Sequence, residues 1–301
     1  MKNKLSPTEY FNQNTKNIDV KSTINILKTI NDEDKKVALA VEKALNEIGQ
    51  AVDIIVENFK SGGRLFYFGA GTSGRLGVLD ASECPPTFSA PKEMVQGYIA
   101  GGDSALRTAV EGAEDSEEFA KSDFERLNIT QKDTIVSISA SGNAKYVVEI
   151  LKLAREKGAK TIGISNNPSA ELKNFSDIFI FLDTGAEVIS GSTRMKAGTS
   201  QKMVLNMLTT ASMIKLGKVY DNLMIDVQPT NEKLKERAVR IVKEITGADE
   251  ETVSLALQKT CYKVKEAIIS IKYSVSKEKA EEMLKNSDGI LKKVFQNYPV
   301  I

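Results

Sequence analysis

The chain has 301 residues, 41% of them hydrophobic and 27% charged, enough to bury a core in one large domain or in a domain with an appendage. Lys and Arg total 41 against 40 Asp and Glu, and this net charge of +1 predicts neither nucleic acid nor an anionic membrane as a partner. The chain contains no histidine, which excludes His-based triads and imidazole general bases. Proton transfer near neutral pH therefore requires a carboxylate, Lys, Cys, Tyr or water.

The sequence also predicts a cytoplasmic location. No apolar run reaches the ~18 residues of a membrane helix, and the first 15 residues have no apolar stretch behind their two lysines. Cys84 and Cys261 are too few for a disulfide framework, so we expect a reducing cytosol.

The first predicted element is a helix over residues 34–60, where apolar side chains recur at steps of three and four. Asn31 or Asp32 is the expected cap, and Gly62-Gly63 the expected end. A short buried strand, 64–68, then runs directly into a loop rich in glycine.

Strand-like and helix-like segments alternate along the rest of the first 217 residues. The expected strands are 95–100, 133–139, 161–165 and 178–182, and the expected helices are 116–127, 146–158 and 195–217. This alternation predicts an α/β fold, a doubly wound parallel sheet with helices on both faces.

The pattern changes near Pro229, after which three amphipathic helices follow without intervening strands, at 231–247, 250–270 and 277–295. We therefore predict a sheet domain over 1–228 and a small helical bundle over 229–301.

The loop GAGTSGR, residues 69–75, is suited to an anion. Gly69, Gly71 and Gly74 permit tight turns and close ligand approach, and the N-terminus of the following helix favours negative charge. The hydroxyls of Thr72 and Ser73 favour a phosphorylated small molecule.

Two other interpretations of this loop remain. Its glycines match GxGxxG, but a dinucleotide site needs an acidic residue about 20 positions later, at the end of the second strand. Glu93 precedes that strand and Asp103 is too distant, which disfavours the dinucleotide. A glycine turn without a ligand is the remaining alternative.

A second loop of this kind, Ser139-Ala-Ser141-Gly142-Asn143, also follows a strand and precedes a helix. Ligands of open parallel sheets bind at the carboxyl ends of the strands. The two loops together therefore predict one phosphate site.

Carboxylates occur in the segments ASECPPT (81–87) and AVEGAED (109–115), namely Glu83, Glu111, Glu114 and Asp115. An isolated Glu is ordinarily a solvated surface charge or belongs to the first turn of a helix. Glu83, however, lies between an apolar run and Cys84-Pro85-Pro86, and a rigid apolar environment would raise its pKa. For Cys84 we prefer buried packing to a nucleophilic role, because no His is present to activate it.

The segment GSTRMKAGTSQK, residues 191–202, leads into the long helix and carries Ser192, Arg194 and Lys196. It fits either solvated charges at a helix start or a loop that contacts an anionic ligand. Under the second interpretation Ser192 and Lys196 join the phosphate site.

At these residues the sequence resembles the N-acetylmuramic acid 6-phosphate etherases, which are built on the sugar isomerase (SIS) domain. The resemblance covers nearly the whole chain and rests on residues 64–88, 101–116, 191–208 and 216–238. It implies a phosphosugar substrate, a homodimer, and neither a metal nor an organic cofactor. It further implies that Glu83 is the proton donor and Glu114 the base in cleaving the C3 lactyl ether, which yields N-acetylglucosamine 6-phosphate and D-lactate.

One loop departs from the family pattern: SGRTPYV is usual, and this chain has SGNAKYV, with Asn143, Ala144 and Lys145 replacing Arg, Thr and Pro. Ser139 and Ser141 remain, and Lys145 can supply a charge.

Two other functions compete with the etherase. One is a non-catalytic phosphosugar sensor, which loss of both carboxylates would favour. The other is a phosphosugar isomerase, which does not explain the ECPPTF or EGAED segments.

Overall fold

The computed structural model describes residues 6–226, 229 and 231–299. By its internal contacts the chain divides into two compact units. The first comprises residues up to 82 together with 92–209, and the second comprises 83–91 together with the chain from 210 onward. The boundary between residues 209 and 210 falls inside a helix, whereas the sequence pattern changes near Pro229. The contacts therefore do not test the predicted boundary at 228/229, which stays a prediction.

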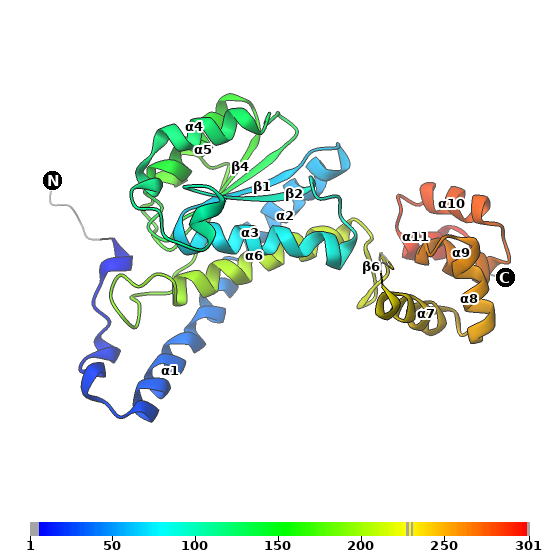
Figure 1. Ribbon diagram of the computed structural model, residues 1–301, viewed down its shortest axis with the longest axis horizontal. Helices are drawn as coiled ribbons and strands as arrows, with labels where there is room; N and C mark the ends of the chain where they lie inside the picture. Colours follow the sequence, from blue (N-terminus) through cyan, green and yellow to red (C-terminus); the bar gives the residue numbers. More distant parts are fainter. Residues whose placement is uncertain (1–5, 227–228, 230, 300–301) are drawn as a thin grey trace. The chain divides into compact units, whose positions relative to one another are not determined.

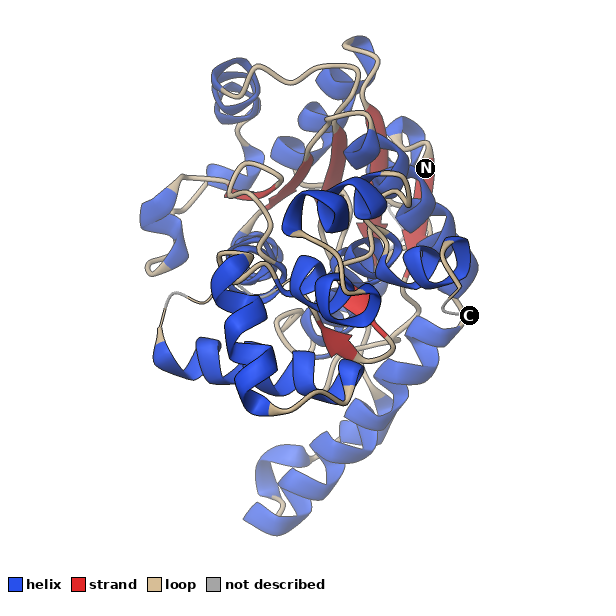
Figure 2. Cartoon of the chain, turned by 90° about the vertical axis from the view of Figure 1, so that its right-hand side faces the viewer, coloured by secondary structure: helices blue, strands red, loops and turns tan. Residues whose placement is uncertain are grey.

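The first unit is built on a sheet of five parallel strands in the order β2-β1-β3-β4-β5. All five strands lie within one or two residues of the predicted segments: β1 Leu65–Gly69, β2 Val95–Ile99, β3 Thr134–Ile138, β4 Lys160–Ser165 and β5 Ile178–Phe181. Figure 2 shows these strands side by side, flanked by helices. The predicted α/β class is confirmed.

Helices cover both faces of this sheet. Figure 1 shows α4 (Glu117–Arg126) and α5 (Lys145–Glu156) on one side, and α3 (Gly71–Phe88) and α6 (Lys196–Lys215) on the other. Alternate residues of β1 supply the two faces: Phe66 and Phe68 join the core beneath α4 and α5, and the Tyr67 hydroxyl donates to Asp80 of α3 at 3.1 Å.

The predicted helix over 34–60 is wrong in its start and in its continuity, while its predicted end at residue 60 is confirmed. The structure has two helices, α1 (Thr23–Glu42) and α2 (Leu45–Lys60), so neither Asn31 nor Asp32 is a cap. Ala44 leaves the helical region with φ −103° and ψ 8°, and this departure separates the two helices, while its side chain stays buried. An apolar repeat can continue through such a break because only one or two residues depart from helical geometry.

The second unit is helical. After the short antiparallel pair β6 (Val219–Tyr220) and β7 (Leu223–Met224) come α7 Glu232–Thr246, α8 Glu250–Lys259, α9 Val264–Tyr273, α10 Lys277–Lys285 and α11 Leu291–Asn297. The prediction of three helices is therefore wrong. Cys261 and Tyr262 adopt φ of 52° and 60°, and Asp288 and Gly289 adopt 55° and 73°, which ends the two longer predicted helices midway.

Candidate active site

The two glycine-rich loops leave neighbouring strands at the same edge of the sheet. In the register of β1 with β3, Gly69 lies opposite Ile138, so the loops that follow these two residues start side by side. The strand order reverses here, because β1 connects to β2 on one side and β3 connects to β4 on the other. Such a reversal opens a crevice at the carboxyl ends of the strands, where ligands of doubly wound sheets bind.

The first loop is held by close backbone packing and by α6. A Cβ at Gly74 would lie 2.6 Å from the Gly69 carbonyl oxygen, so only glycine allows α3 to start this close to β1. The Ser73 hydroxyl is buried and donates to Gln201 Oε1 at 2.8 Å. Ser73 retains acceptor capacity only, so the donation to phosphate that we predict for it requires a change of hydrogen-bond partner.

The second loop is closed by its own hydroxyls. Ser139 Oγ accepts from the Gly142 amide at 3.0 Å, and a Cβ at Gly142 would lie 2.2 Å from the Ala170 methyl carbon. Asn143, one of the residues that depart from the family pattern, accepts from the Glu171 amide at 2.9 Å. Asn143 thereby ties the loop to η6 (Glu171–Phe175), while Lys145 is exposed in the first turn of α5.

A cavity of about 350 Å³ lies beside the first loop, within the first unit. Gly71 and Glu114 both line it, as does Glu111. The structure thus brings the predicted base to the loop that starts α3. Glu114 belongs to the one-turn helix η5 (Ala113–Asp115), and its side chain is exposed and accessible to a substrate.

Arg75 also lines this cavity, and sequence reasoning missed it. Its guanidinium donates to the carbonyl oxygens of Leu106 at 2.9 Å and of Ala105 at 2.7 Å, in the 3₁₀ helix η4 (Asp103–Leu106). Arg75 therefore holds one wall of the cavity to α3. The sequence feature that could have pointed to Arg75 is its position at the end of the GTSGR segment.

Glu83 differs from what its sequence context predicts. It lies inside α3 rather than in a loop or at a helix start, and its side chain is exposed rather than enclosed by apolar groups. The helix continues through Pro85 and Pro86, since the φ of proline fits a helix even though proline lacks an amide donor. Glu83 belongs to the second unit and Glu114 to the first. The neighbouring Cys84 is buried, as predicted.

Lys196 is the first residue of α6, and its ammonium group donates to Glu33 Oε2 of α1 at 2.7 Å. Both side chains are almost fully buried, at 1% and 4% exposed. The ammonium of Lys196 is thus already paired, and its role in phosphate binding stays a prediction. Ser192 is half-buried in the turn before α6, and Arg194 is exposed.

Glu187 caps the N-terminus of α6. Its two carboxylate oxygens accept from the backbone amides of Lys196 at 3.0 Å and Ala197 at 2.9 Å. Burial raises the pKa of Glu187, although these amide bonds and the nearby Lys196 favour its charged form. Sequence reasoning missed both Glu33 and Glu187, which lie far from the glycine-rich loops along the chain.

Among the described residues, no three His, Cys, Asp or Glu side chains gather in a way that would hold a metal ion. Within the same residues, none of the helices has the length and apolarity needed to cross a membrane.

Comparison with known proteins agrees with this geometry. Residues 109–211 match the SIS domain, residues 47–155 the glucokinase regulatory protein N-terminal SIS domain, and residues 221–285 the C-terminal lid domain of glucokinase regulatory protein. A solved phosphoheptose isomerase from Neisseria gonorrhoeae shares the fold with a TM-score of 0.50 at 17% identity, over 64% of this chain and 98% of its own. The chain is therefore an SIS-domain protein.

Its relatives narrow the class to one family. N-acetylmuramic acid 6-phosphate etherases from Caldanaerobacter subterraneus subsp. tengcongensis and a Geobacillus species are 54% and 50% identical to it. The alignments cover 94% and 96% of this chain, and 93% and 98% of the relatives. An etherase from Clostridium botulinum is 53% identical over 94% of both chains. This chain belongs to the N-acetylmuramic acid 6-phosphate etherase family.

Proposed function

We propose that this protein cleaves the C3 D-lactyl ether of N-acetylmuramic acid 6-phosphate by elimination and water addition. The products are N-acetylglucosamine 6-phosphate and D-lactate, as expected in amino sugar and cell-wall recycling. The observation that carries the proposal is identity of 50% or more to etherases over nearly the full length of the chain. The cavity beside the first glycine loop, with Glu114 in its wall, supports it.

The chemistry accounts for two carboxylates. A C3 ether is not an acetal, so it has no oxocarbenium route to cleavage. Ring opening exposes an aldehyde at C1, which acidifies the C2 proton and places the ether oxygen in the β position. A base removes the C2 proton, the electron pair forms a C2–C3 double bond, and the C3–O bond breaks as an acid protonates the lactate oxygen. Water then adds its hydroxyl to C3 and a proton to C2.

In this scheme Glu114 is the base and Glu83 the acid. The phosphate group binds at the edge where the two glycine-rich loops meet. The residues proposed to bind it are Gly71, Thr72, Ser73, Ser139, Ser141, Gly142, Ser192 and Lys196. The scheme uses only side chains of the protein and water, so it calls for no cofactor.

Isotopic labelling tests the scheme directly. Reaction in deuterated, oxygen-18 water should place deuterium at C2 and the heavy oxygen at C3 of the sugar, with none newly placed in the lactate hydroxyl. The oxygen label is decisive, since a proton shielded from solvent can return to C2. Heavy oxygen in lactate would mean attack on the lactyl carbon and would overturn the scheme.

Matched carboxamide variants test the assigned roles. Glu83→Gln and Glu114→Gln should each lower lactate release by roughly 10²–10⁴-fold, because each removes a positioned proton transfer. Glu114→Gln should also suppress exchange of the C2 proton of the sugar with solvent, and Glu83→Gln should leave this exchange intact. Glu111→Gln is the control, since Glu111 lines the same cavity and should change kcat little. A larger loss in Glu111→Gln than in Glu114→Gln would reassign the base.

Phosphate anchoring has its own test. Ser73→Ala, Ser139→Ala and Ser141→Ala should each raise KM, by about tenfold or more where a charge-assisted hydrogen bond is lost. Unchanged KM and kcat/KM in all three variants would place the phosphate elsewhere.

We also propose a cytoplasmic homodimer. Ile24, Leu27 and Leu39 on α1 are each more than half exposed, an apolar surface that a second copy would cover. Light scattering at micromolar concentration should report twice the mass of the chain, and a monomer would contradict the dimer.

The glucokinase regulatory protein domains matched by this chain correspond to the sensor alternative. A sensor would bind phosphosugar without releasing lactate, and the two carboxylates would then be dispensable. Glu83 and Glu114 are both present, in the segments that carry the resemblance to etherases, which favours the enzyme over both the sensor and a phosphosugar isomerase.

A further inference from the structure

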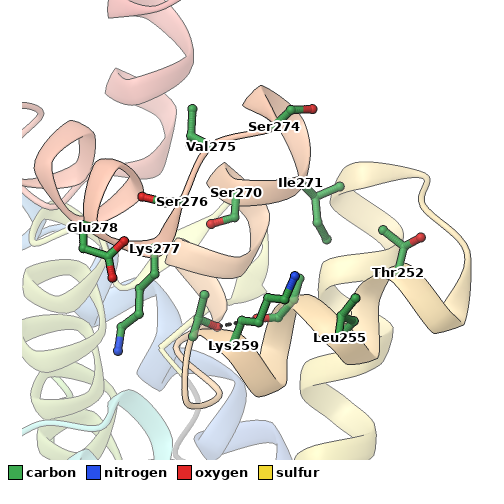
Figure 3. Close-up of a pocket in the computed structure, with 12 residues that line it drawn as sticks. Thr252, Leu255, Lys259, Ser270, Ile271, Ser274, Val275, Ser276, Lys277 and Glu278 are labelled. Carbon is green, nitrogen blue, oxygen red and sulfur yellow. Dashed lines mark hydrogen bonds between the residues drawn. The ribbon is translucent and has the colours of Figure 1, made fainter.

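The helical unit contains a cavity of its own. It has a volume of about 570 Å³ and is bordered by α8, α9, α10 and the turns that join them (Figure 3). Small-molecule sites typically have volumes of about 300–1,000 Å³. Every lining residue lies between Thr252 and Glu278, so none of them belongs to the proposed ether-cleaving site.

One wall of this cavity is apolar. Leu255 of α8 is 51% exposed, and Ile271 and Val275 are partly exposed beside the same space. Figure 3 shows Leu255 and Ile271 on the same side of the cavity. Covering this hydrocarbon surface would be favourable, at about 25 cal/mol per Å².

The other side of the cavity offers a hydroxyl without a partner. Ser270 Oγ is buried and makes no hydrogen bond within the described residues. A buried polar group without a hydrogen-bond partner is unfavourable, so a ligand that supplied one would be stabilised. The neighbouring Thr260 differs, because its hydroxyl donates to the Ala256 carbonyl oxygen at 3.0 Å. Ser270 therefore has no hydrogen bond to break, and its buried hydroxyl must turn toward the cavity to bond a ligand.

The charge of the lining is positive, with the ammonium groups of Lys259 and Lys277 against the carboxylate of Glu278. Lys259 forms no ion pair with any described residue, and Figure 3 shows it below Ser270 in the lining of the cavity. The lining favours a ligand with one negative charge, because Glu278 would repel a second.

We propose that this cavity binds a small carboxylate with a hydrocarbon body. Lys259 and Ser270 donate to the carboxylate, and the hydrocarbon lies against Leu255 and Ile271. A phosphate dianion fits less well, since the apolar wall would leave part of its oxygens without donors.

The test is a titration of the full-length protein carrying ¹³C-labelled isoleucine methyl groups. Ile271→Val identifies the Ile271 signal by its loss. Isovalerate should shift this signal in a saturable manner, while isovaleramide, which has the same shape without the charge, should bind at least tenfold more weakly. Inorganic phosphate should not saturate the site. Equal binding of the amide, tighter binding of phosphate, or no saturable shift would each overturn the proposal.

Substitutions in the cavity lining test which side chains bind the carboxylate. Lys259→Gln and Ser270→Ala should each weaken isovalerate binding by about fivefold or more, since each removes a hydrogen bond to a charged group. Lys285→Gln is the matched control, because Lys285 is exposed on α10 outside the cavity lining. Equal affinity in Lys259→Gln and Lys285→Gln would overturn the proposal. These three substitutions replace side chains outside the apolar core of the unit. Thermal unfolding at no lower temperature than that of the native protein confirms that the variants are folded.

Discussion

The two units of this chain use charge differently. In the sheet unit, Glu33 and Lys196 bury both partners of an ion pair, at 4% and 1% exposed. In the helical unit, Lys265 is buried, but its partner Asp226 is 24% exposed. Lys279 and Glu282 of the same unit are both about half exposed. Losing the charge of Glu33 should therefore destabilise the sheet unit far more than losing the charge of Lys279 destabilises the helical unit.

The reason lies in what surrounds each pair. Charges removed from water are stable only while they remain paired, whereas exposed charges are solvated whether paired or not. Both units have an apolar core, and that of the helical unit includes Val242, Val253 and Leu257. The comparison predicts that loss of a buried charge is costly in the sheet unit, whereas in the helical unit the largest losses come from truncating core side chains.

The largest effect is expected for Glu33→Gln. The change removes the ion-pair partner of the buried Lys196 ammonium, and breaking such a pair costs about 3–5 kcal/mol. Urea unfolding should show this loss. Asp32→Asn is the control, since Asp32 pairs with Lys35 on the exposed face of α1 and should cost less than about 0.5 kcal/mol. Equal losses in the two variants would mean that burial of an ion pair does not set its contribution to stability.

In the helical unit, Leu257→Ala should cost about 3 kcal/mol. Leu257 is fully buried, and truncating a core leucine loses apolar burial and leaves a cavity. Leu255→Ala, an exposed leucine on the same helix, should cost much less. The difference in unfolding free energy between these two variants, measured in urea, shows how much the apolar core contributes to the stability of this unit.

Acid should weaken the sheet unit through Glu33. Burial raises its pKa, but hydrogen bonds from Lys196, Lys36 and Asn14 outweigh burial and lower the pKa to about 2 from 4.5. The stabilisation is therefore complete above about pH 4.5 and is lost as pH falls toward 2. Between pH 6 and pH 3 the contribution should fall by about 2 kcal/mol.

The measurement is the difference in unfolding free energy between the native protein and Glu33→Gln at both pH values. Other carboxylates titrate equally in the two proteins and cancel in this difference. A difference that does not shrink at pH 3 would mean that Glu33 is not held in its charged form.

The smallest effect is expected for Lys279→Gln on α10. The pair with Glu282, at 3.0 Å, is exposed on both sides and should contribute about 0.2–0.5 kcal/mol, further reduced by salt. A cost above about 1 kcal/mol in urea unfolding would show that exposed pairs in this unit act as strongly as core contacts.

Local pattern was sufficient to predict the sheet and the loops. Short apolar runs such as 64–68 end at glycines, and a buried strand followed by a glycine turn needs no information from distant residues. The same holds for the second loop after 133–139. Helix boundaries were predicted less well, because a residue such as Ala44 or Cys261 leaves helical geometry without interrupting the apolar repeat.

Only the tertiary structure decided which side chains meet. Glu33 and Lys196 are 163 residues apart in sequence, and Arg75 reaches carbonyl oxygens 30 and 31 residues away. No spacing or composition marks these pairings, because they depend on how α1, α3 and α6 pack in the folded chain. By itself the sequence determined the fold class, the position of the two glycine-rich loops and, through its resemblance, the family, and it named the candidate carboxylates. The fold determined that the ammonium of Lys196 is paired, that Glu114 lines a cavity and that Glu83 is exposed, since burial and pairing arise only when distant segments come together.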